Sequence, residues 1–220
     1  EEEIVRDANK LLGTNVDLDC RPSFLSAGLA RNFVPSMVPM IATRGEFLTS
    51  YTPYQPEVSQ GMLQAMWEFQ TMISELVQLP ISNVSMYDAS TSAAEAITCA
   101  VRVKSKKVEK PNTVFISELV PPHRMSVIHN YTQGVGIEII KLPHREDGLL
   151  DLEKASLASG SCAVYVEQPN SFGILDEGLI RLREIVGEKT AIIVGVDVTT
   201  LGLVEPPGNW GADIVVGEGQ

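Results

Sequence analysis

The sequence predicts an α/β domain in which helices cover both faces of a mainly parallel β-sheet. Short runs rich in β-branched residues alternate with segments of helical pattern, and this alternation is typical of parallel sheets. In addition, 44% of the 220 residues are hydrophobic, which provides enough apolar material for one sizeable core. The predicted strands are 114–117, 137–142, 163–167, 191–196 and 213–216, and the helices between them are 122–131, 152–158 and 177–186.

Helical patterns also precede the first predicted strand. Residues 4–12 form a short amphipathic pattern. Residues 57–77 repeat apolar side chains at spacings of three and four, which gives one broad apolar face, and Pro56 suits the first turn of this helix. A further helix is expected to begin near Ser90 and to continue to Val103, because an alanine-rich sequence favours helix.

Charge and hydropathy exclude several functional classes. The formal net charge of −11 and the pI of about 4.7 argue against sequence-independent binding to nucleic acid, which depends on lysine and arginine. No apolar run approaches the roughly 18 to 20 residues that cross a bilayer, and the acidic start does not resemble a secretory signal. We therefore expect a soluble, cytoplasmic protein with no membrane partner.

The cysteines and histidines are not expected to bind a metal. They are widely spread, with no CxxC pair or Cys/His spacing suited to zinc and no acidic cluster beside them. We interpret them as buried, exposed or structural side chains. These residues are Cys20, Cys99, Cys162, His123, His129 and His144.

A loop of hydrogen-bonding side chains precedes the helix at 57–77. It brings together two phenols, a hydroxyl, an amide and a carboxylate. Prolines stiffen the loop, and the N-terminus of a helix favours negative charge nearby, so the loop is a candidate for holding a small carboxylate or the edge of a cofactor. An ordinary proline-rich start of a helix explains the same composition. The residues are Tyr51, Thr52, Tyr54, Gln55 and Glu57.

Small hydroxyl residues mark the start of the next helix. Ser90 and Thr91 present side-chain donors beside backbone N–H groups, an arrangement that can hold a phosphate without positive charge. Simple N-capping explains them equally well, and Ser92 and Glu95 have the spacing of a capping box. Asp88 would repel an anion. Near the other end of the chain, Asp197 closes a predicted strand, either as a cap or as a catalytic group.

Several strings of residues resemble one known family. The longest is Tyr51-Thr52-Pro53-Tyr54-Gln55-Pro56-Glu57-Val58-Ser59-Gln60-Gly61, and others are Phe33-Val34-Pro35, Ser85-Met86-Tyr87-Asp88, Gln168-Pro169-Asn170 and the run 211–220. After about the first 20 residues, nearly the whole chain resembles glycine decarboxylase, the P-protein of the glycine cleavage system. The resemblance is to subunit 1 of the two-subunit form.

This resemblance implies the large domain of a fold-type I, aspartate aminotransferase-like, pyridoxal phosphate enzyme. In that fold an aspartate at a strand end pairs with the pyridine nitrogen, and a lysine after the next strand forms the Schiff base. Asp197 falls at the first position and Gln220 at the second. An amide cannot form an imine, so Ser90, Thr91, Asp197 and Gln220 are interpreted as positions of a degenerate cofactor site, and subunit 2 is expected to bind the cofactor covalently.

The resemblance also implies an activity and partners. Subunits 1 and 2 together are expected to decarboxylate glycine and to transfer the aminomethyl group to the lipoyl arm of H-protein, with two copies of each subunit in the assembly. The loop residues 51–57 are then expected to reach across the interface to the partner's cofactor or substrate. One alternative is a non-catalytic scaffold that stabilises the cofactor-bearing subunit. A self-sufficient pyridoxal phosphate decarboxylase or aminotransferase is a less favoured alternative.

Two segments are expected within the chain. Residues 1–50 are interpreted as an N-terminal segment that packs on the large domain and on the partner, and residues 51–220 as the large domain, truncated at its C-terminus. The chain is accordingly expected to be a fragment that lacks the small C-terminal domain of the family.

Overall fold

The structure is a computed structural model that describes residues 1–16, 32–48 and 52–219. The chain divides into two compact units, Glu1–Phe33 and Val34–Gln220. In the first unit, helix α1 (Glu2–Leu12) confirms the helix expected at 4–12. Acidic residues occupy its first turn and Lys10 its last turn, which matches the direction of the helix dipole.

Three helices of the second unit precede the core. They are α2 (Met37–Ala42), α3 (Gly45–Leu48) and α4 (Gln60–Val77). The prediction that Pro56 lies in the first turn of α4 is wrong, because the backbone N–H of Val58 bonds to the carbonyl of Gln55 and closes a turn before the helix. No residue before Val77 is buried in the part of the chain that the structure describes.

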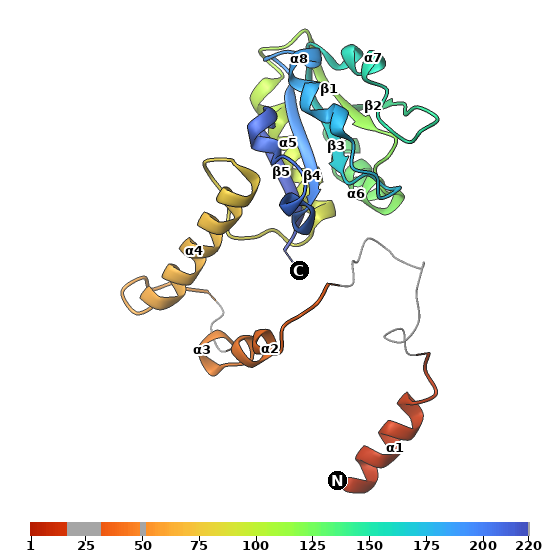
Figure 1. The fold of residues 1–220 in the computed structure, drawn as a ribbon. Helices are drawn as coiled ribbons and strands as arrows, with labels where there is room; N and C mark the ends of the chain where they lie inside the picture. The colour runs from red at the N-terminus through yellow and green to blue at the C-terminus, as the bar shows by residue number, and fades with distance from the viewer. Residues whose placement is uncertain (17–31, 49–51, 220) are drawn as a thin grey trace. The chain divides into compact units, whose positions relative to one another are not determined.

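The described residues form a five-stranded sheet in the order β2-β1-β3-β4-β5, and every neighbouring pair is parallel (Figure 1). Each predicted strand is therefore confirmed. A parallel sheet covered on both faces requires long apolar runs, and β3 meets this requirement with all eight residues buried. The strands are β1 (Lys110–Ser117), β2 (Glu138–Leu142), β3 (Ser161–Gln168), β4 (Ala191–Asp197) and β5 (Ile214–Glu218).

Helices cover both faces of the sheet, as predicted. Helices α5 (Ala89–Lys104) and α6 (Pro122–Gln133) pack on one face, where Tyr165 and Ile193 belong to the same buried cluster as Ile97 and Ile128. Shorter elements cover the other face, where the cluster contains Val164 and Ile192. They are α7 (Leu152–Ala155), η1 (Ser156–Ala158), η2 (Glu177–Arg181), α8 (Leu182–Val186) and η3 (Val198–Gly202), and η4 (Pro207–Trp210) precedes β5.

Two predicted helices are only partly α-helical. Residues 152–158 divide into α7 and the 3-10 helix η1, and residues 177–186 divide into the 3-10 helix η2 and α8. Each begins at an aspartate cap: Asp151 accepts from the N–H of Lys154, and Asp176 from that of Gly178. The shorter elements still bury apolar side chains against the sheet, including Ala155, Leu179 and Leu182.

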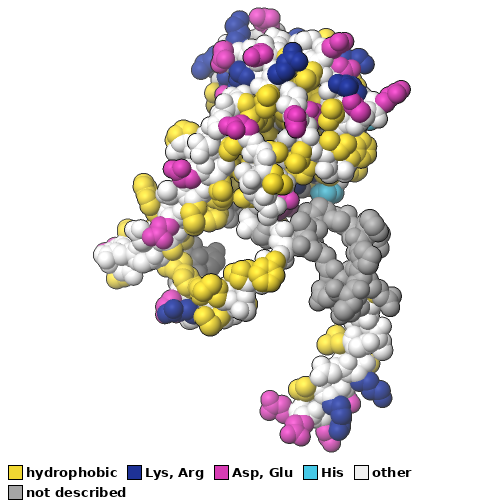
Figure 2. All heavy atoms as spheres, in the orientation of Figure 1, with side chains coloured by type: hydrophobic (Ala, Val, Ile, Leu, Met, Phe, Trp, Pro, Cys, Tyr) yellow, Lys and Arg dark blue, Asp and Glu magenta, His cyan; other side chains and the backbone are white. Residues whose placement is uncertain are grey.

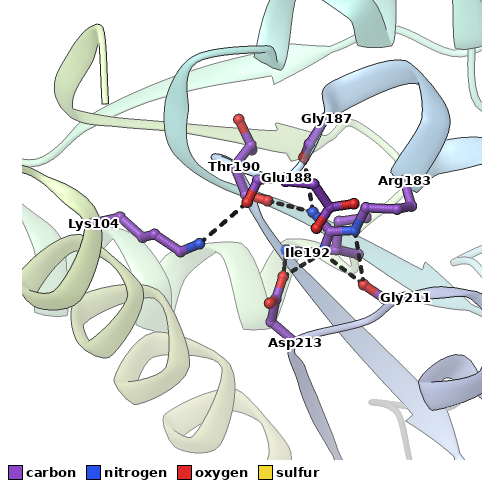
Figure 3. A network of polar contacts seen from close by, with 8 residues as sticks. All are labelled: Lys104, Arg183, Gly187, Glu188, Thr190, Ile192, Gly211 and Asp213. Carbon is purple, nitrogen blue, oxygen red and sulfur yellow. Dashed lines mark hydrogen bonds and ion pairs between the residues drawn. The ribbon is translucent and has the colours of Figure 1, made fainter. Parts of the chain in front are cut away.

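Arg183 connects the segments that precede β4 and β5 at the amino-terminal edge of the sheet (Figure 3). Its guanidinium donates to the carbonyls of Gly187 at 2.8 Å, Thr190 at 2.9 Å and Gly211 at 2.6 Å. It also contacts the Asp213 carboxylate at 2.5 Å, and that carboxylate accepts from the N–H of Ile192 at 2.8 Å. One side chain of α8 therefore fixes the segments that lead into β4 and β5.

Candidate functional site at the carboxyl edge of the sheet

Three acidic residues lie where adjacent strands end. They are Glu167 of β3, Asp197 of β4 and Glu218 of β5. Side chains alternate between the faces of a strand, and Tyr165, Ile193 and Val216 belong to the cluster on the α5 face. Glu167 and Glu218 lie two residues after Tyr165 and Val216, and Asp197 lies four residues after Ile193, so the three carboxylates are placed on that same face. Asp197 and Glu218 are also direct partners in the β4–β5 register.

The N-terminus of α5 is capped by Asp88. Its carboxylate accepts from the backbone N–H and the hydroxyl of Thr91, both at 2.7 Å, and its own N–H donates to the Thr91 hydroxyl at 3.2 Å. The hydrogen bonds from the Thr91 N–H and hydroxyl lower the pKa of Asp88 below its usual value. The capping box expected from Ser92 and Glu95 is therefore wrong, because Asp88 and Thr91 form it instead.

A second carboxylate meets α5 from a distant part of the sequence. Oε1 of Glu218 accepts a hydrogen bond of 2.9 Å from the backbone N–H of Ala89, the first residue of the helix. Ser90 is buried, and the Thr91 side chain is used by the cap. Of the two interpretations of these hydroxyl residues, the contacts of Thr91 support N-capping.

A buried network lies beside this helix start. Arg124 of α6 donates to Glu167 at 2.7 Å, and the Tyr165 hydroxyl donates to the same oxygen at 2.9 Å. Burial raises the pKa of Glu167, although the positive charge of Arg124 acts to lower it. Burial also raises the pKa of Tyr165. Nε of Arg124 is buried without a hydrogen-bond partner among the described residues. The positive charge of Arg124 also helps to lower the pKa of Asp88, so the network and the cap interact electrostatically.

Gly195 provides the space for this network. A Cβ atom at Gly195 would lie 2.6 Å from the Tyr165 hydroxyl and 3.1 Å from Cγ of Glu167. Glycine is therefore required at this position of β4 for the tyrosine and the glutamate to occupy the α5 face together. The sequence reasoning did not identify this network, although a charged residue in the otherwise apolar strand β3 is a recognisable signal.

Asp197 acts as a cap in this structure. Its carboxylate accepts from the N–H of Thr199 at 3.0 Å and from the Thr199 hydroxyl at 2.7 Å, at the start of η3. This supports the cap interpretation of Asp197. Its register partner Glu218 connects it to the start of α5, so the structure does bring Asp197 and Ser90 to the same edge of the sheet.

The loop before α4 is exposed, unlike the buried residues at the carboxyl edge of the sheet. Thr52, Tyr54, Gln55 and Glu57 are exposed, and 76% of Tyr54 is accessible. Because α4 begins only at Gln60, this loop does not lead directly into a helix N-terminus. Tyr51 and Gln220, the remaining predicted site residues, lie outside the described residues.

The residues at this edge do not fit pyridoxal phosphate, the cofactor that the resemblance implies. Carboxylates already accept the backbone N–H groups at the start of α5 that a phosphate would need. Lys141, near the carboxyl end of β2, lies on the outermost strand and is separated from Asp197 of β4 by β1 and β3. Lys110 begins β1 and Lys189 precedes β4, which places both at the opposite edge.

No helix of the described residues is long and apolar enough to cross a membrane, and no group of their histidines, cysteines, aspartates and glutamates is suited to hold a metal ion.

Comparison with known proteins identifies the relatives of this chain. The family model described as "Glycine cleavage system P-protein" matches residues 1–220. A Thermococcus onnurineus protein named "Probable glycine dehydrogenase (decarboxylating) subunit 1" is 47% identical over 220 residues, which are 99% of this chain and 48% of that protein. A Saccharolobus islandicus protein of the same name is 40% identical over 225 residues, with the same 48% share of its length.

Solved structures agree with the sequence comparisons. A crystal structure of glycine decarboxylase (P-protein) of the glycine cleavage system, in inhibitor-bound form, superposes with a TM-score of 0.84 at 39% identity and covers 99% of this chain and 48% of that one. A NifS-like protein superposes with a TM-score of 0.59 at 13% identity over 81% of this chain and 49% of that one, and so shares the fold alone. The chain spans about half the length of the curated relatives it matches.

Proposed function

Because the chain belongs to the P-protein family of the glycine cleavage system, we propose that it acts within subunit 1 of a two-subunit glycine decarboxylase. In this proposal the two subunits together decarboxylate glycine and pass the aminomethyl group to the lipoyl arm of H-protein. Pyridoxal phosphate is bound covalently by subunit 2, and this chain is inactive alone. The family resemblance further suggests two copies of each subunit and a cytoplasmic location.

One observation carries the assignment of the cofactor to the partner. The carboxyl edge of the sheet is filled by side chains of this chain, since Glu218 and Asp88 take the N–H groups at the start of α5. In the sequence, Gln220 follows β5 where the resemblance implies a lysine, and an amide has no nucleophilic nitrogen. In this proposal the amine for the Schiff base comes from subunit 2.

Exposed residues ahead of the core support a role at a subunit interface. In α4, only Val77 is buried although much of the helix is apolar, and 70% of Trp67 is accessible. Figure 2 shows hydrophobic side chains along α4 and along the segment that holds α2 and α3, where Met40 is 66% accessible. Exposed apolar surface of this extent is typical of protein interaction sites. We propose that loop residues 51–57, which precede α4, meet the partner's site.

Reconstitution of the complete natural chain with subunit 2 and lipoylated H-protein tests the proposal. Tyr54→Phe and Gln55→Ala are expected to lower the release of carbon dioxide from carboxyl-labelled glycine by about tenfold each, the size expected when a positioning hydrogen bond is lost. Assembly, measured by size-exclusion chromatography, should not change. Tyr131→Phe is the matched control, because Tyr131 is also exposed but lies on α6.

Two results would contradict the proposal. If both loop variants keep full activity, the chain is only a scaffold that stabilises its partner. If the complete natural chain releases carbon dioxide from glycine without subunit 2, the assignment of the cofactor to the partner is wrong.

A further inference from the structure

Helix α5 presents its N-terminus at the carboxyl edge of the sheet. The helix has 16 residues, and its first turn contains no acidic side chain. An N-terminus of this kind carries partial positive charge and free N–H groups, and it attracts anions. The acidic side chains that contact it come from outside the helix.

The N–H groups of the first turn are already bonded. Ala89 donates to Glu218 at 2.9 Å, and Thr91 donates to Asp88 at 2.7 Å. Ser92 donates to the carbonyl of Asp88 at 2.9 Å. The backbone N–H of Ser90 also helps to lower the pKa of Asp88. Asp88 is an ordinary N-cap, whereas Glu218 lies 129 residues away in sequence and occupies the position that an external anion would take.

The backbone of β5 holds Glu218 in place. A Cβ atom at Gly217 would lie 2.7 Å from the carbonyl oxygen of Val196, so only glycine allows β5 to approach β4 this closely. Glu218 then pairs with Asp197 in the register, on the face that α5 covers. The backbone of β5 thus places the Glu218 carboxylate within hydrogen-bond distance of α5.

The charges around the start of α5 also disfavour the binding of a phosphate. Asp88, Asp197 and Glu218 are acidic, and the charge of Arg124 is paired with Glu167 at 2.7 Å. A phosphate monoester carries about −1.5 to −2 charge at neutral pH. It would meet both a filled set of donors and repulsion from neighbouring carboxylates.

We propose that Glu218 is a built-in anion that closes the N-terminus of α5 to phosphate-bearing ligands. Because of this contact, the chain does not take up pyridoxal phosphate at the edge where its fold would otherwise offer a phosphate site. The closure itself follows from the contacts of this chain. Its consequence, that subunit 1 does not compete with subunit 2 for the cofactor, rests on the proposed function above.

The test measures phosphate binding to the complete natural chain, without partner or glycine. Wild-type, Glu218→Ala and Glu146→Ala chains are titrated with inorganic phosphate by calorimetry, with chloride at matched ionic strength as the reference. Glu146 is an exposed residue of the loop after β2, so its substitution changes the net charge equally at a distance from α5. Glu218→Ala is expected to bind phosphate at least tenfold more tightly than wild type and Glu146→Ala. Pyridoxal 5′-phosphate should show the same order.

Two outcomes would overturn the proposal: wild type binding phosphate as tightly as Glu218→Ala, or a folded Glu218→Ala chain that gains no affinity. If Glu218→Ala does not fold, Glu218→Gln decides the question. Its amide oxygen still accepts from Ala89, but a neutral acceptor is weaker than a charged one. Glu218→Gln should gain about threefold in phosphate affinity, and no gain would refute the closure. The decarboxylation assay is independent of this titration, so the two proposals fail separately.

Discussion

Replacement of Arg183 by methionine is expected to destabilise the protein strongly. Methionine keeps an unbranched stem for packing but removes every donor of the guanidinium. The carbonyls of Gly187, Thr190 and Gly211 then lose their bonds to a charged group, and the Asp213 carboxylate loses its ion pair. At about 1 to 1.5 kcal/mol for each of these carbonyls, the free energy of unfolding should fall by about 3 to 5 kcal/mol.

Equilibrium unfolding in urea at pH 7 measures this loss as a lower midpoint with an unchanged slope. Arg181→Met is the matched control, because Arg181 is exposed on η2, and it should change stability by less than about 0.5 kcal/mol. Arg183→Lys should fall between them, since a single ammonium cannot reproduce the fork of a guanidinium. A loss below about 1 kcal/mol in Arg183→Met would refute the view that this side chain holds the amino-terminal edge together.

Two further predictions concern the carboxyl edge of the sheet. Asp88→Ala should cost about 1 kcal/mol at pH 7, the usual value of an N-cap. Because the folded-state pKa of Asp88 lies below its ordinary 3.8, this contribution is complete above pH 3.8 and is lost as the pH falls through the folded pKa. Urea midpoints of wild type and Asp88→Ala should therefore converge in acid, and a constant gap would contradict this origin. Gly195→Ala should cost about 1 to 3 kcal/mol, because its Cβ would lie 2.6 Å from the Tyr165 hydroxyl. Thermal unfolding of the double variant Gly195→Ala/Tyr165→Phe should show less than the sum of the single losses, whereas simple additivity would exclude this clash.

Local patterns predicted the sheet well. Strands such as β3 and β4 are continuous apolar runs buried on both faces, so their sequence determines both their position and their parallel pairing. The helix boundaries were less predictable. Residues 57–59 fit the helical pattern of α4, but the turn that begins at Pro56 delays the helix to Gln60. At α5 the sequence suggested a capping box of Ser92 and Glu95, but Asp88 is the cap. The Ser92 hydroxyl instead donates to the Asp88 carbonyl at 2.7 Å.

The interactions of the candidate site could not be predicted from local patterns. The Glu218–Ala89 bond joins residues 129 apart in sequence, and the Arg124–Glu167 pair joins residues 43 apart. Neither contact leaves a periodic signal. Resemblance to a family indicated that Ser90 and Asp197 would share an edge, but only the folded chain shows that Glu218 of β5 pairs with Asp197 and accepts from the start of α5.

The strand order has a consequence for folding during synthesis. Strand β1 pairs with β2 on one side and with β3 on the other, although β3 leaves the ribosome only after α6, β2 and α7. Until then one edge of β1 has unpaired backbone groups, and an open edge is a template for incorrect pairing with another chain. Parallel strands also cannot close as local hairpins. Emergence of β3 thus closes the open edge of β1, and emergence of β4 then closes the edge of β3.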